Sequence, residues 1–484
     1  MRCWIAVTLP LLPLQALHPR WCEPLPLAII HDGQVIALNR LAAEQGARPG
    51  MRSAGVAALA PRVQLQPRDL WRERQTFDAL ALALMQYTPE IAVDGQDLLL
   101  DVSASLSLFG GPRRLIRRVH DHVHALGLSA RLGMAPTAQA AVLFARQPGR
   151  QRRKLKRASM QRLLDTLPFV LLPAAAREAE WLESIGCRTL AELRRLPRSG
   201  LRRRTHAALL DTLDRAYGEA PELFDWLSTP ENFDAAIELP YQIDLAPHLL
   251  FAVQRLVLQL TGWLAARQQA VTRFVLWLEH ELGRTQQSPT ALEIVLAEPS
   301  WQEAHLLRLL KERLGRLQLA APVIALRLEA AHLVPWAAPS GQLFPEPGGT
   351  PEDYRRLLEL LAARLGPEAV QLPAACADYR PEIANQWQYT QNAAGNGEGE
   401  MPFGSRPFWL LEQPLPLIVR GHRPFYGSPL RLLVGPERIE TGWWDGALAL
   451  RDYFVAQGEE GVCYWVYRER DADSARWFLH GLFG

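Results

Sequence analysis

The first 146 residues alternate short apolar runs with amphipathic stretches of helical period. The run CWIAVTL at 3–9 predicts a buried strand, and two apolar runs flank Asp32-Gly33, a dipeptide that favours a hairpin turn. The remaining pattern predicts a short helix closed by Gly46, helices at 72–87, 112–126 and 136–146, and strands at 98–103 and 128–134. This order predicts an α+β fold in which helices cover one face of a sheet.

The apolar amino terminus MRCWIAVTLPLLPLQAL also has the general character of an export signal. Pro10 and Pro13 interrupt the apolar run, however, and no small-residue cleavage pattern follows it before Trp21. We therefore expect this segment to begin with a structural strand of the mature protein.

Two further regions follow towards the carboxyl terminus. Residues 232–336 predict a second α/β unit, with helices at 247–266 and 300–317 and strands at 271–280 and 323–330. A Pro- and Gly-rich passage at 339–349 predicts a linker, and residues 350–366 predict a helix with Thr350 as its N-cap. The later sequence is rich in aromatic residues and predicts a small β-rich module.

Composition indicates a soluble protein of several domains. A chain of 484 residues exceeds one ordinary core and predicts about three or four domains. Its hydrophobic share of 48% and charged share of 21% are typical of globular proteins. The five cysteines are scattered and never form a C-x-x-C pair. We therefore expect reduced thiols in a cytoplasmic protein, without a disulfide framework or a zinc site.

The net charge of +2 conceals a strongly basic segment. Residues 146–204 hold sixteen Lys and Arg against five Asp and Glu, so the rest of the chain is acidic. One helix is expected to end at Gly186, and another to begin after Thr189, whose spacing to Glu192 predicts a capping box. This arrangement can aim backbone amides at phosphates, so the segment predicts DNA binding, with a solvated helical face as the alternative. The residues assigned to DNA are Arg152, Arg153, Lys154, Lys156, Arg157, Arg188, Arg194, Arg195, Arg202, Arg203 and Arg204.

Four short motifs resemble those of the Y family, the lesion-bypass DNA polymerases. They are GARPGM at 46–51 (fingers), LLDVS at 99–103 and RLGMAPTAQAAVLFAR at 131–146 (palm), and SIGCRTLAEL at 184–193 (thumb). The resemblance implies a palm with fingers at 1–160 (fingers about 11–75), a helix-hairpin-helix thumb at 161–230 and a little finger at 231–337. A linker at 338–350 and a partner-binding region at 351–484 would complete the chain.

The residues at the catalytic positions differ from the family pattern. Such polymerases use three carboxylates to hold two metal ions, which activate the 3′-hydroxyl and neutralise the leaving pyrophosphate. The resemblance places Thr8 and Pro10 at the first two aspartates and Gln96 and Asp97 at the later acidic pair, with Asp94 as an alternative survivor. The triphosphate-gripping positions fall on Arg40, Ala43 and Ala138. This implies a polymerase fold that does not polymerise and needs no metal or cofactor; an active lesion-bypass polymerase is the alternative.

Motifs in the carboxyl-terminal part resemble the catalytically inactive Y-family homologues of bacterial mutagenesis cassettes. They are LFPEPGGTPED at 343–353, GPERIETGWWDG at 435–446 and RDYFVA at 451–456. This branch implies an adaptor in SOS-induced translesion synthesis. Its implied partners are DNA, the sliding clamp (beta subunit), the accessory protein ImuA and a DnaE-type error-prone polymerase that supplies the chemistry. A DNA-binding protein of unrelated role is a further alternative.

Three further patterns bear on binding. A clamp-binding peptide needs a Gln anchor and two apolar side chains; the linker offers Gln342, Leu343 and Phe344, and a second candidate is Gln413, Leu415 and Leu417. Trp443 and Trp444 cannot both face inward on a strand, so we expect one of them to contact a partner. HDHVH at 120–124 predicts surface histidines, and the acids around Gly95 are either a relic metal site or turn residues.

Overall fold

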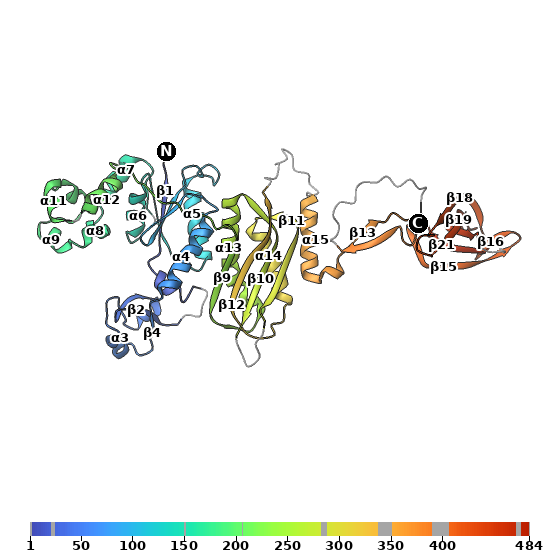
Figure 1. The fold of residues 1–484 in the computed structure, drawn as a ribbon, viewed down its shortest axis with the longest axis horizontal. Helices are drawn as coiled ribbons and strands as arrows, with labels where there is room; N and C mark the ends of the chain where they lie inside the picture. The colour runs from blue at the N-terminus through green and yellow to red at the C-terminus, as the bar shows by residue number, and fades with distance from the viewer. Residues whose placement is uncertain are drawn as a thin grey trace. The chain divides into compact units, whose positions relative to one another are not determined.

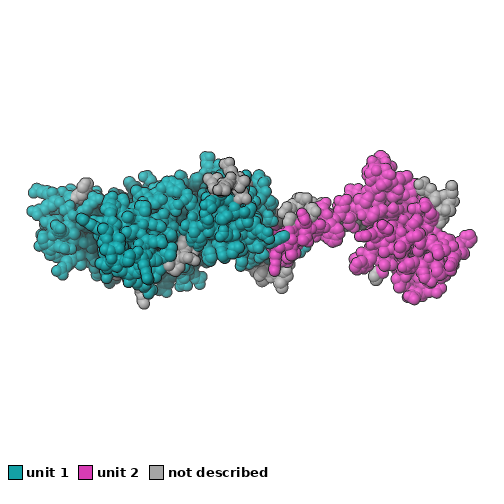
Figure 2. Space-filling model, turned by 90° about the horizontal axis from the view of Figure 1, so that it is seen from below, with its two compact units in different colours: residues 1–356 teal, residues 357–484 magenta. Residues whose placement is uncertain are grey.

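The computed structural model of the chain describes residues 2–20, 25–149, 152–205, 207–281, 288–336, 351–389, 406–470 and 476–483. They belong to two units, residues 1–356 and 357–484, which are coloured separately in Figure 2. We use the names palm with fingers, thumb and little finger for the segments expected at residues 1–160 (fingers about 11–75), 161–230 and 231–337.

The palm is built around β1 (Trp4–Thr8), which lies between two antiparallel neighbours. The sheet order is β5 (Ile91–Asp94), β6 (Asp97–Asp101), β1, β7 (Arg131–Ala135) and β8 (Arg152–Arg153). Alternation sends Ile5 and Val7 into a core with α4 (Leu70–Leu84) and α5 (Pro112–Ala125). Trp4 and Ala6 face α6 (Ala138–Arg146) on the other side. The strand at 3–9 is confirmed, but the expectation that helices cover one face only is wrong, because the apolar faces of β1 are both buried.

The fingers carry a small sheet in the order β3 (Gln34–Leu38), β2 (Leu27–His31), β4 (Gln64–Pro67). The predicted hairpin is confirmed: Asp32 and Gly33 both have positive φ, as a two-residue turn between paired strands requires. Three short helices complete this segment, α1 (Leu12–Gln15), α2 (Arg40–Glu44) and α3 (Ser53–Leu59).

The thumb is helical and contains the predicted capped turn. Its helices are α7 (Arg157–Asp165), α8 (Pro173–Ala176), α9 (Ala179–Ser184), α10 (Leu190–Arg195), α11 (Arg198–Arg204) and α12 (Ala207–Tyr217). Gly186 takes a positive φ after α9, and the capping box of Thr189 and Glu192 is formed at the start of α10. The helix, glycine turn and capped helix expected from the sequence are therefore confirmed.

The little finger is a four-stranded antiparallel sheet with two helices on one face (Figure 1). The order is β11 (Thr290–Ser300), β10 (Gln269–His280), β12 (Val323–Pro335) and β9 (Asp234–Ile243), with α13 (Leu250–Arg267) and α14 (Glu303–Arg316). The predicted helices and two inner strands are confirmed; β9 and β11 were not predicted. Within the described ranges, one helical stretch, Ala246–Arg267, is long and apolar enough to cross a membrane, but 72% of its apolar window is buried, as in a core helix.

A close helix contact joins the little finger to the palm. Leu258 of α13 is buried in the palm core beside α4. At Gly262 of the same helix, an added Cβ would lie 2.2 Å from the carbonyl oxygen of Leu82 in α4. Only a residue without a side chain allows the two helix backbones to approach this closely.

The second unit is β-rich, as predicted. Helix α15 (Pro351–Leu365) leads into the pair β13 (Gln371–Ala375) and β14 (Asn385–Tyr389). A seven-stranded sheet follows, in the order β17 (Ser428–Pro429), β16 (Arg423–Tyr426), β15 (Trp409–Arg420), β21 (Trp477–Leu482), β20 (Cys463–Glu469), β19 (Ala449–Gln457) and β18 (Arg431–Thr441). Tyr453, Trp465 and Tyr467 are stacked in its core, so much of the aromatic content is structural.

One expectation about histidines is wrong. His122, a residue of α5, is buried rather than exposed, because its side of the helix faces the palm core. Burial lowers its pKa to about 4, and its Nδ1 lies 2.8 Å from Nε2 of Gln86, which donates to it when the ring is neutral.

The close contact at Gly262 predicts that alanine is tolerated much less well there than at Gly315 of α14. Gly262→Ala should lower the free energy of unfolding by about 1–3 kcal/mol, because the new methyl group must push α13 away from α4. Gly315→Ala in α14 is the control, since a Cβ there meets nothing within 4 Å, and it should be neutral or stabilising by up to about 1 kcal/mol. Urea unfolding of both variants tests this; equal stabilities would contradict the close contact.

Candidate functional site

Thr8 and Asp97 stand opposite each other at the end of the palm sheet. They are register partners on β1 and β6, so their side chains project from the same face. The Thr8 hydroxyl donates a hydrogen bond to Oδ1 of Asp97. Asp97 is fully buried, with 0% of its surface exposed. The structure thus brings together two residues that the sequence placed at catalytic positions.

Arg146 supplies the cation that Asp97 contacts. It is the last residue of α6, where a positive charge also suits the helix dipole. Its Nη2 and Nε donate to Oδ2 of Asp97 at 2.7 and 3.1 Å. Burial raises the pKa of the Asp97 carboxyl, and Arg146 and Thr8 oppose that rise. Each oxygen of Asp97 therefore already has a protein partner.

These residues do not fit a two-metal centre. Thr8 offers a neutral hydroxyl, and it uses that hydroxyl as a donor to Asp97. Gln96 is an exposed turn residue, and Pro10 is exposed after β1 with no donor atom in its side chain. Among the residues that the structure describes, no three His, Cys, Asp or Glu side chains are grouped to hold a metal ion. The centre thus contains one carboxylate that is neutralised by a guanidinium, where two divalent ions would require several carboxylates.

The neighbouring acids have structural partners. Asp94 accepts a hydrogen bond of 2.6 Å from Nε2 of Gln139. Asp101 accepts one of 3.0 Å from the backbone N–H of Ser103. Gly95 has a positive φ in the turn between β5 and β6. The contacts of Asp94 and Asp101 are therefore those of turn formation and local hydrogen bonding.

A carboxylate that the sequence did not reveal occupies the start of α6. The backbone N–H groups of Ala138 and Gln139 donate to the Glu222 carboxylate at 2.9 and 2.8 Å. Burial raises the pKa of Glu222, and these two amides oppose the rise. A helix amino terminus attracts anions. Here that place is taken by the chain's own acid, next to the position (Ala138) that the family resemblance assigns to triphosphate binding.

Glu222 is the first residue of a segment that packs on the palm sheet, here called the strap (residues 222–227). Phe224 and Trp226 pack against Trp4, with ring centroids 5.0 and 6.0 Å away. The backbone N–H of Leu227 donates to the carbonyl of Ile91, on edge strand β5, at 2.8 Å. The chain between thumb and little finger is thus held on the same sheet as Thr8 and Asp97.

The basic residues assigned to DNA fall into two groups. Arg157 donates to carbonyls at the end of α12, Arg194 pairs with Glu219, and the Arg204 guanidinium lies 5.6 Å from the Trp181 ring. Arg152 and Arg153 form β8 at the edge of the palm sheet. Six members of the set are exposed and have no side-chain ion pair, hydrogen bond or ring contact within the described part of the chain: Lys154, Lys156, Arg188, Arg195, Arg202 and Arg203. This second group is available to phosphates.

The two candidate clamp peptides differ in what can be described. Gln342, Leu343 and Phe344 lie outside the described residues. Gln413, Leu415 and Leu417 lie within β15, where Leu415 and Leu417 are register partners of Leu479 and Trp477 on β21. A peptide that enters a groove as an extended strand needs a free backbone, and β15 is paired here.

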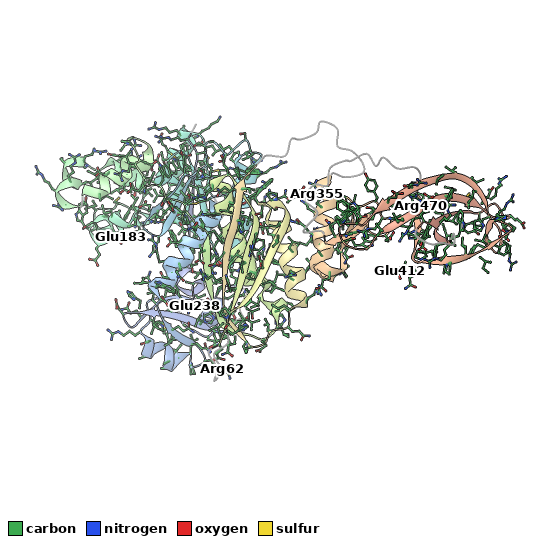
Figure 3. All side chains as sticks on the ribbon, turned by 45° about the vertical axis from the view of Figure 1, so that its right-hand side comes forward. Arg62, Glu183, Glu238, Arg355, Glu412 and Arg470 are labelled. Carbon is green, nitrogen blue, oxygen red and sulfur yellow. The ribbon has the colours of Figure 1, made fainter. Side chains whose placement is uncertain are left out.

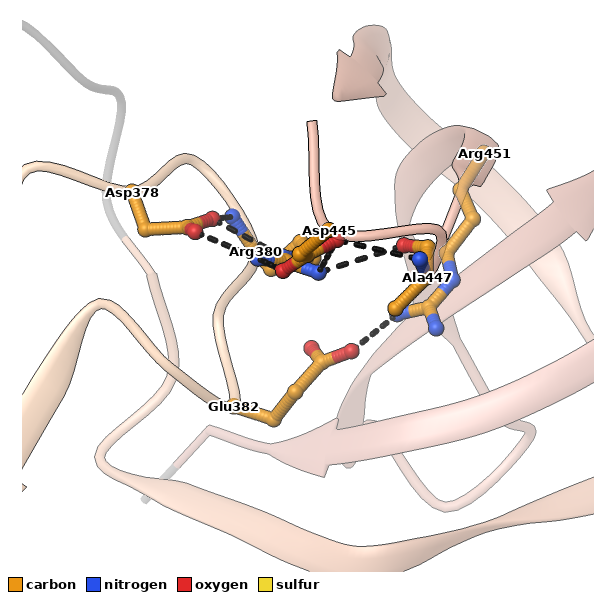
Figure 4. A network of polar contacts seen from close by, with 6 residues as sticks. All are labelled: Asp378, Arg380, Glu382, Asp445, Ala447 and Arg451. Carbon is orange, nitrogen blue, oxygen red and sulfur yellow. Dashed lines mark hydrogen bonds and ion pairs between the residues drawn. The ribbon is translucent and has the colours of Figure 1, made fainter. Parts of the chain in front are cut away.

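Trp443 and Trp444 lie in a turn between β18 and β19 rather than on a strand, and both are exposed, by 77% and 53%. Arg380, nearly buried, donates to Asp378, Asp445 and the carbonyl of Ala447, as Figure 4 shows. It holds the pKa of Asp378 and Asp445 below their usual range. The turn that presents the two indoles is therefore fixed from beneath.

The Arg146–Asp97 ion pair predicts that removing the arginine alone destabilises the protein more than removing both charges. Arg146→Met should lower the free energy of unfolding by about 3 kcal/mol, because it leaves the buried Asp97 carboxylate without its cation. Adding Asp97→Asn should recover part of that loss. Arg74→Met is the control, since the Arg74–Asp78 pair is exposed and should cost less than about 0.5 kcal/mol. Urea unfolding measures all three; an Arg146→Met cost as small as the control would contradict the pairing.

Comparison with known proteins adds three findings. The model of the impB/mucB/samB family matches residues 14–146, from the fingers to Arg146. Protein ImuB of two Caulobacter vibrioides strains is 25% identical over 473 residues, which cover 91% of this chain and all of the relative. Among solved structures, a Y-family polymerase chimera of Dbh and Dpo4 and an insertion ternary complex of Dbh align with 69% of this chain and 99% of theirs, at 18% and 16% identity and TM-scores of 0.38 and 0.39.

The family match covers three of the four motifs that resemble the Y family, those at 46–51, 99–103 and 131–146. The similarity to Protein ImuB spans both units of the chain. The chain is therefore similar to Protein ImuB over 91% of its length, and its residues 14–146 match the impB/mucB/samB family.

Proposed function

We propose that this protein is a non-catalytic adaptor of translesion DNA synthesis. It binds DNA through the thumb and palm edge, binds the sliding clamp, and recruits an accessory protein of the ImuA type and a DnaE-type error-prone polymerase. The polymerase supplies the chemistry, within the cytoplasm and as part of the SOS response to DNA damage.

The main support for this proposal is that the buried Asp97 carboxylate already has partners within the chain. It is the acid that remains at the aligned catalytic pair, and Thr8 and Arg146 engage its two oxygens inside the sheet. To bind a divalent ion, Asp97 would have to exchange a formed, buried ion pair for the ion while Thr8 brings no charge. Glu222 in turn occupies the helix amides that would attract a phosphate. The chain's own charges stand where metal and nucleotide would need to bind.

Binding to DNA is supported by the distribution of charge. The exposed bases of the thumb and of the palm edge, among them Lys154, Lys156 and Arg202, provide the counter-charge that phosphates require. In the capped turn the backbone N–H groups of Arg188 and Thr189 donate to the Glu192 carboxylate, so the DNA contacts are assigned to the exposed side chains.

Recruitment of partners is supported by the second unit. The exposed indoles of Trp443 and Trp444 stand on a turn that Arg380 fixes, so little conformational entropy is lost when a partner covers them. Clamp binding is assigned to Gln342, Leu343 and Phe344, because the sequence predicts a linker there and clamp-type grooves bind short extended peptides.

Primer extension with magnesium separates the adaptor from an active lesion-bypass polymerase. The purified chain should add no nucleotide to a primed template, undamaged or carrying a lesion, above the level of an Asp97→Ala variant prepared in parallel. The matched variant controls for a contaminating polymerase. Templated incorporation that Asp97→Ala abolishes would mean that the chain polymerises.

A clamp pulldown separates the adaptor from a DNA-binding protein of unrelated role. The intact chain should retain the sliding clamp, and Leu343→Ala with Phe344→Ala should abolish retention because both apolar anchors are lost. Leu415→Ala with Leu417→Ala, in paired β15, should leave it unchanged after folding has been checked by circular dichroism. Absence of clamp binding by the intact chain would count against the adaptor.

A further inference from the structure

Helix α5 carries a row of arginines on the outer side of the palm. Its large apolar side chains are buried in the palm core: Leu115, Ile116, Val119 and Val123. The arginines occupy positions i, i+1, i+4 and i+5, which lie along one side of a helix, and all of them are exposed. This row, here called the arginine stripe, consists of Arg113, Arg114, Arg117 and Arg118.

The arginine stripe has little negative charge beside it. The sequence between residues 102 and 120 contains no Asp or Glu. Asp121 follows Arg117 by one turn, but its carboxylate contacts His120, with Oδ1 3.4 Å from Nδ1 of the ring. Within the described ranges, none of the stripe arginines forms an ion pair. Their positive charge is therefore largely uncompensated.

Arg118 differs from the other members of the arginine stripe. Its guanidinium lies 5.6 Å from the centre of the Phe109 ring. The charge of Arg118 lowers the pKa of Tyr87, which burial raises. Asp121 and Glu303 act on the pKa of the same phenol with the opposite sign, so both acids lie in the surroundings of Arg118. The open charge of the stripe is thus that of the other three arginines.

Helix stability does not account for the arginine stripe. Arg113 and Arg114 lie in the first turn of α5, and that turn contains no acidic residue. The amino-terminal end of a helix dipole is positive, so basic side chains there lower the stability of the helix. Basic residues at an unfavourable position indicate a role in binding.

The composition of this surface favours nucleic acid over protein as its partner. Protein interfaces have an apolar core, whereas DNA interfaces are polar and strongly basic. The large apolar side chains of α5 face inward, so its outer side has no apolar centre. The helix contains no Phe, Tyr or Trp on which an unpaired base could stack. These features match the phosphate backbone of a duplex.

The arginine stripe and Thr8 lie on opposite faces of the palm sheet. Alternation along β1 directs Trp4, Ala6 and Thr8 towards α6, where the buried side chains of the thumb belong to the same core. Val7 points to the opposite side, which α5 covers. Figure 1 shows α6 and α5 on the two sides of β1. A duplex bound to the stripe therefore does not lie over the Thr8 side of the sheet.

We propose that the arginine stripe binds the phosphate backbone of duplex DNA, as a second contact surface separate from the bases of the thumb and palm edge. Guanidinium groups along one side of a helix neutralise phosphates without contacting base edges, so this binding is independent of sequence. The stripe adds a surface to the DNA binding of the proposed function, and it does not depend on clamp or partner binding.

Two double variants of the full chain that lose equal charge test the proposal. Arg113→Gln with Arg117→Gln changes the arginine stripe. Arg74→Gln with Arg355→Gln is the control, because both arginines are exposed and each already pairs with an acid; Figure 3 labels Arg355. Fluorescence anisotropy measures the binding of a labelled duplex of about 20 base pairs over a range of salt concentrations. Urea unfolding should show the stripe variant to be at least as stable as the unaltered chain, because Arg113 lies at the helix start.

The stripe variant should bind the duplex about tenfold more weakly in about 0.1 M salt, with a salt dependence shallower by about one to two phosphate contacts. The control should bind within about twofold of the unaltered chain, with the same salt dependence. A stripe variant that binds the duplex as tightly as the control does would overturn the proposal. Loss of binding to a labelled polyglutamate peptide, but not to the duplex, would also overturn it, because the stripe would then receive an acidic protein.

A third variant, Lys154→Gln with Lys156→Gln, distinguishes this proposal from the proposed function. It should also weaken duplex binding, and its effect should multiply with that of the stripe variant, because the two surfaces are separate. A loss in the lysine variant alone would leave the proposed function standing and overturn the arginine stripe. A loss in the stripe variant alone would support the stripe and count against the assignment of DNA to the palm edge.

Discussion

The stability of the palm sheet depends on neutralising one buried carboxylate, that of Asp97. Asp97 is enclosed in the sheet between β1 and β5, where an unpaired charge would cost several kcal/mol. Thr8 and Arg146 meet that requirement from the next strand and from the end of α6. This single contact sets the side chain that β1 must carry at its end and the length to which α6 must run. It also occupies the carboxylate oxygens that a divalent ion would need.

Charge is distributed unevenly among the segments of the first unit. The thumb and the palm edge leave six of the bases assigned to DNA exposed and without a described partner, whereas the little finger pairs Arg273 and Arg327 with acids. Glu222 and Arg146 use up further charges inside the palm. The small net charge of the whole chain is therefore the sum of surfaces with opposite electrostatic preferences.

Much of the architecture could be predicted from the sequence, because short local patterns determine many of its elements. CWIAVTL, the Asp32-Gly33 turn and the Thr189 capping box each specify their own structure within a few residues. The site was predictable only in part. The resemblance placed Thr8 and Asp97, but Arg146 and Glu222 reach the palm centre through the tertiary fold, across 49 and 84 residues respectively. Strand β9 was missed because Pro240 and a register shift interrupt its alternation at the sheet edge.

The strap has a consequence for how the segments of the first unit can move. It connects thumb to little finger, and its contacts with Trp4 and Ile91 leave it no slack, while Gly262 holds α13 against α4. A connector without slack is a spacer rather than a hinge. The strap and the contact between α13 and α4 therefore restrain how far the thumb and the little finger can move relative to the palm.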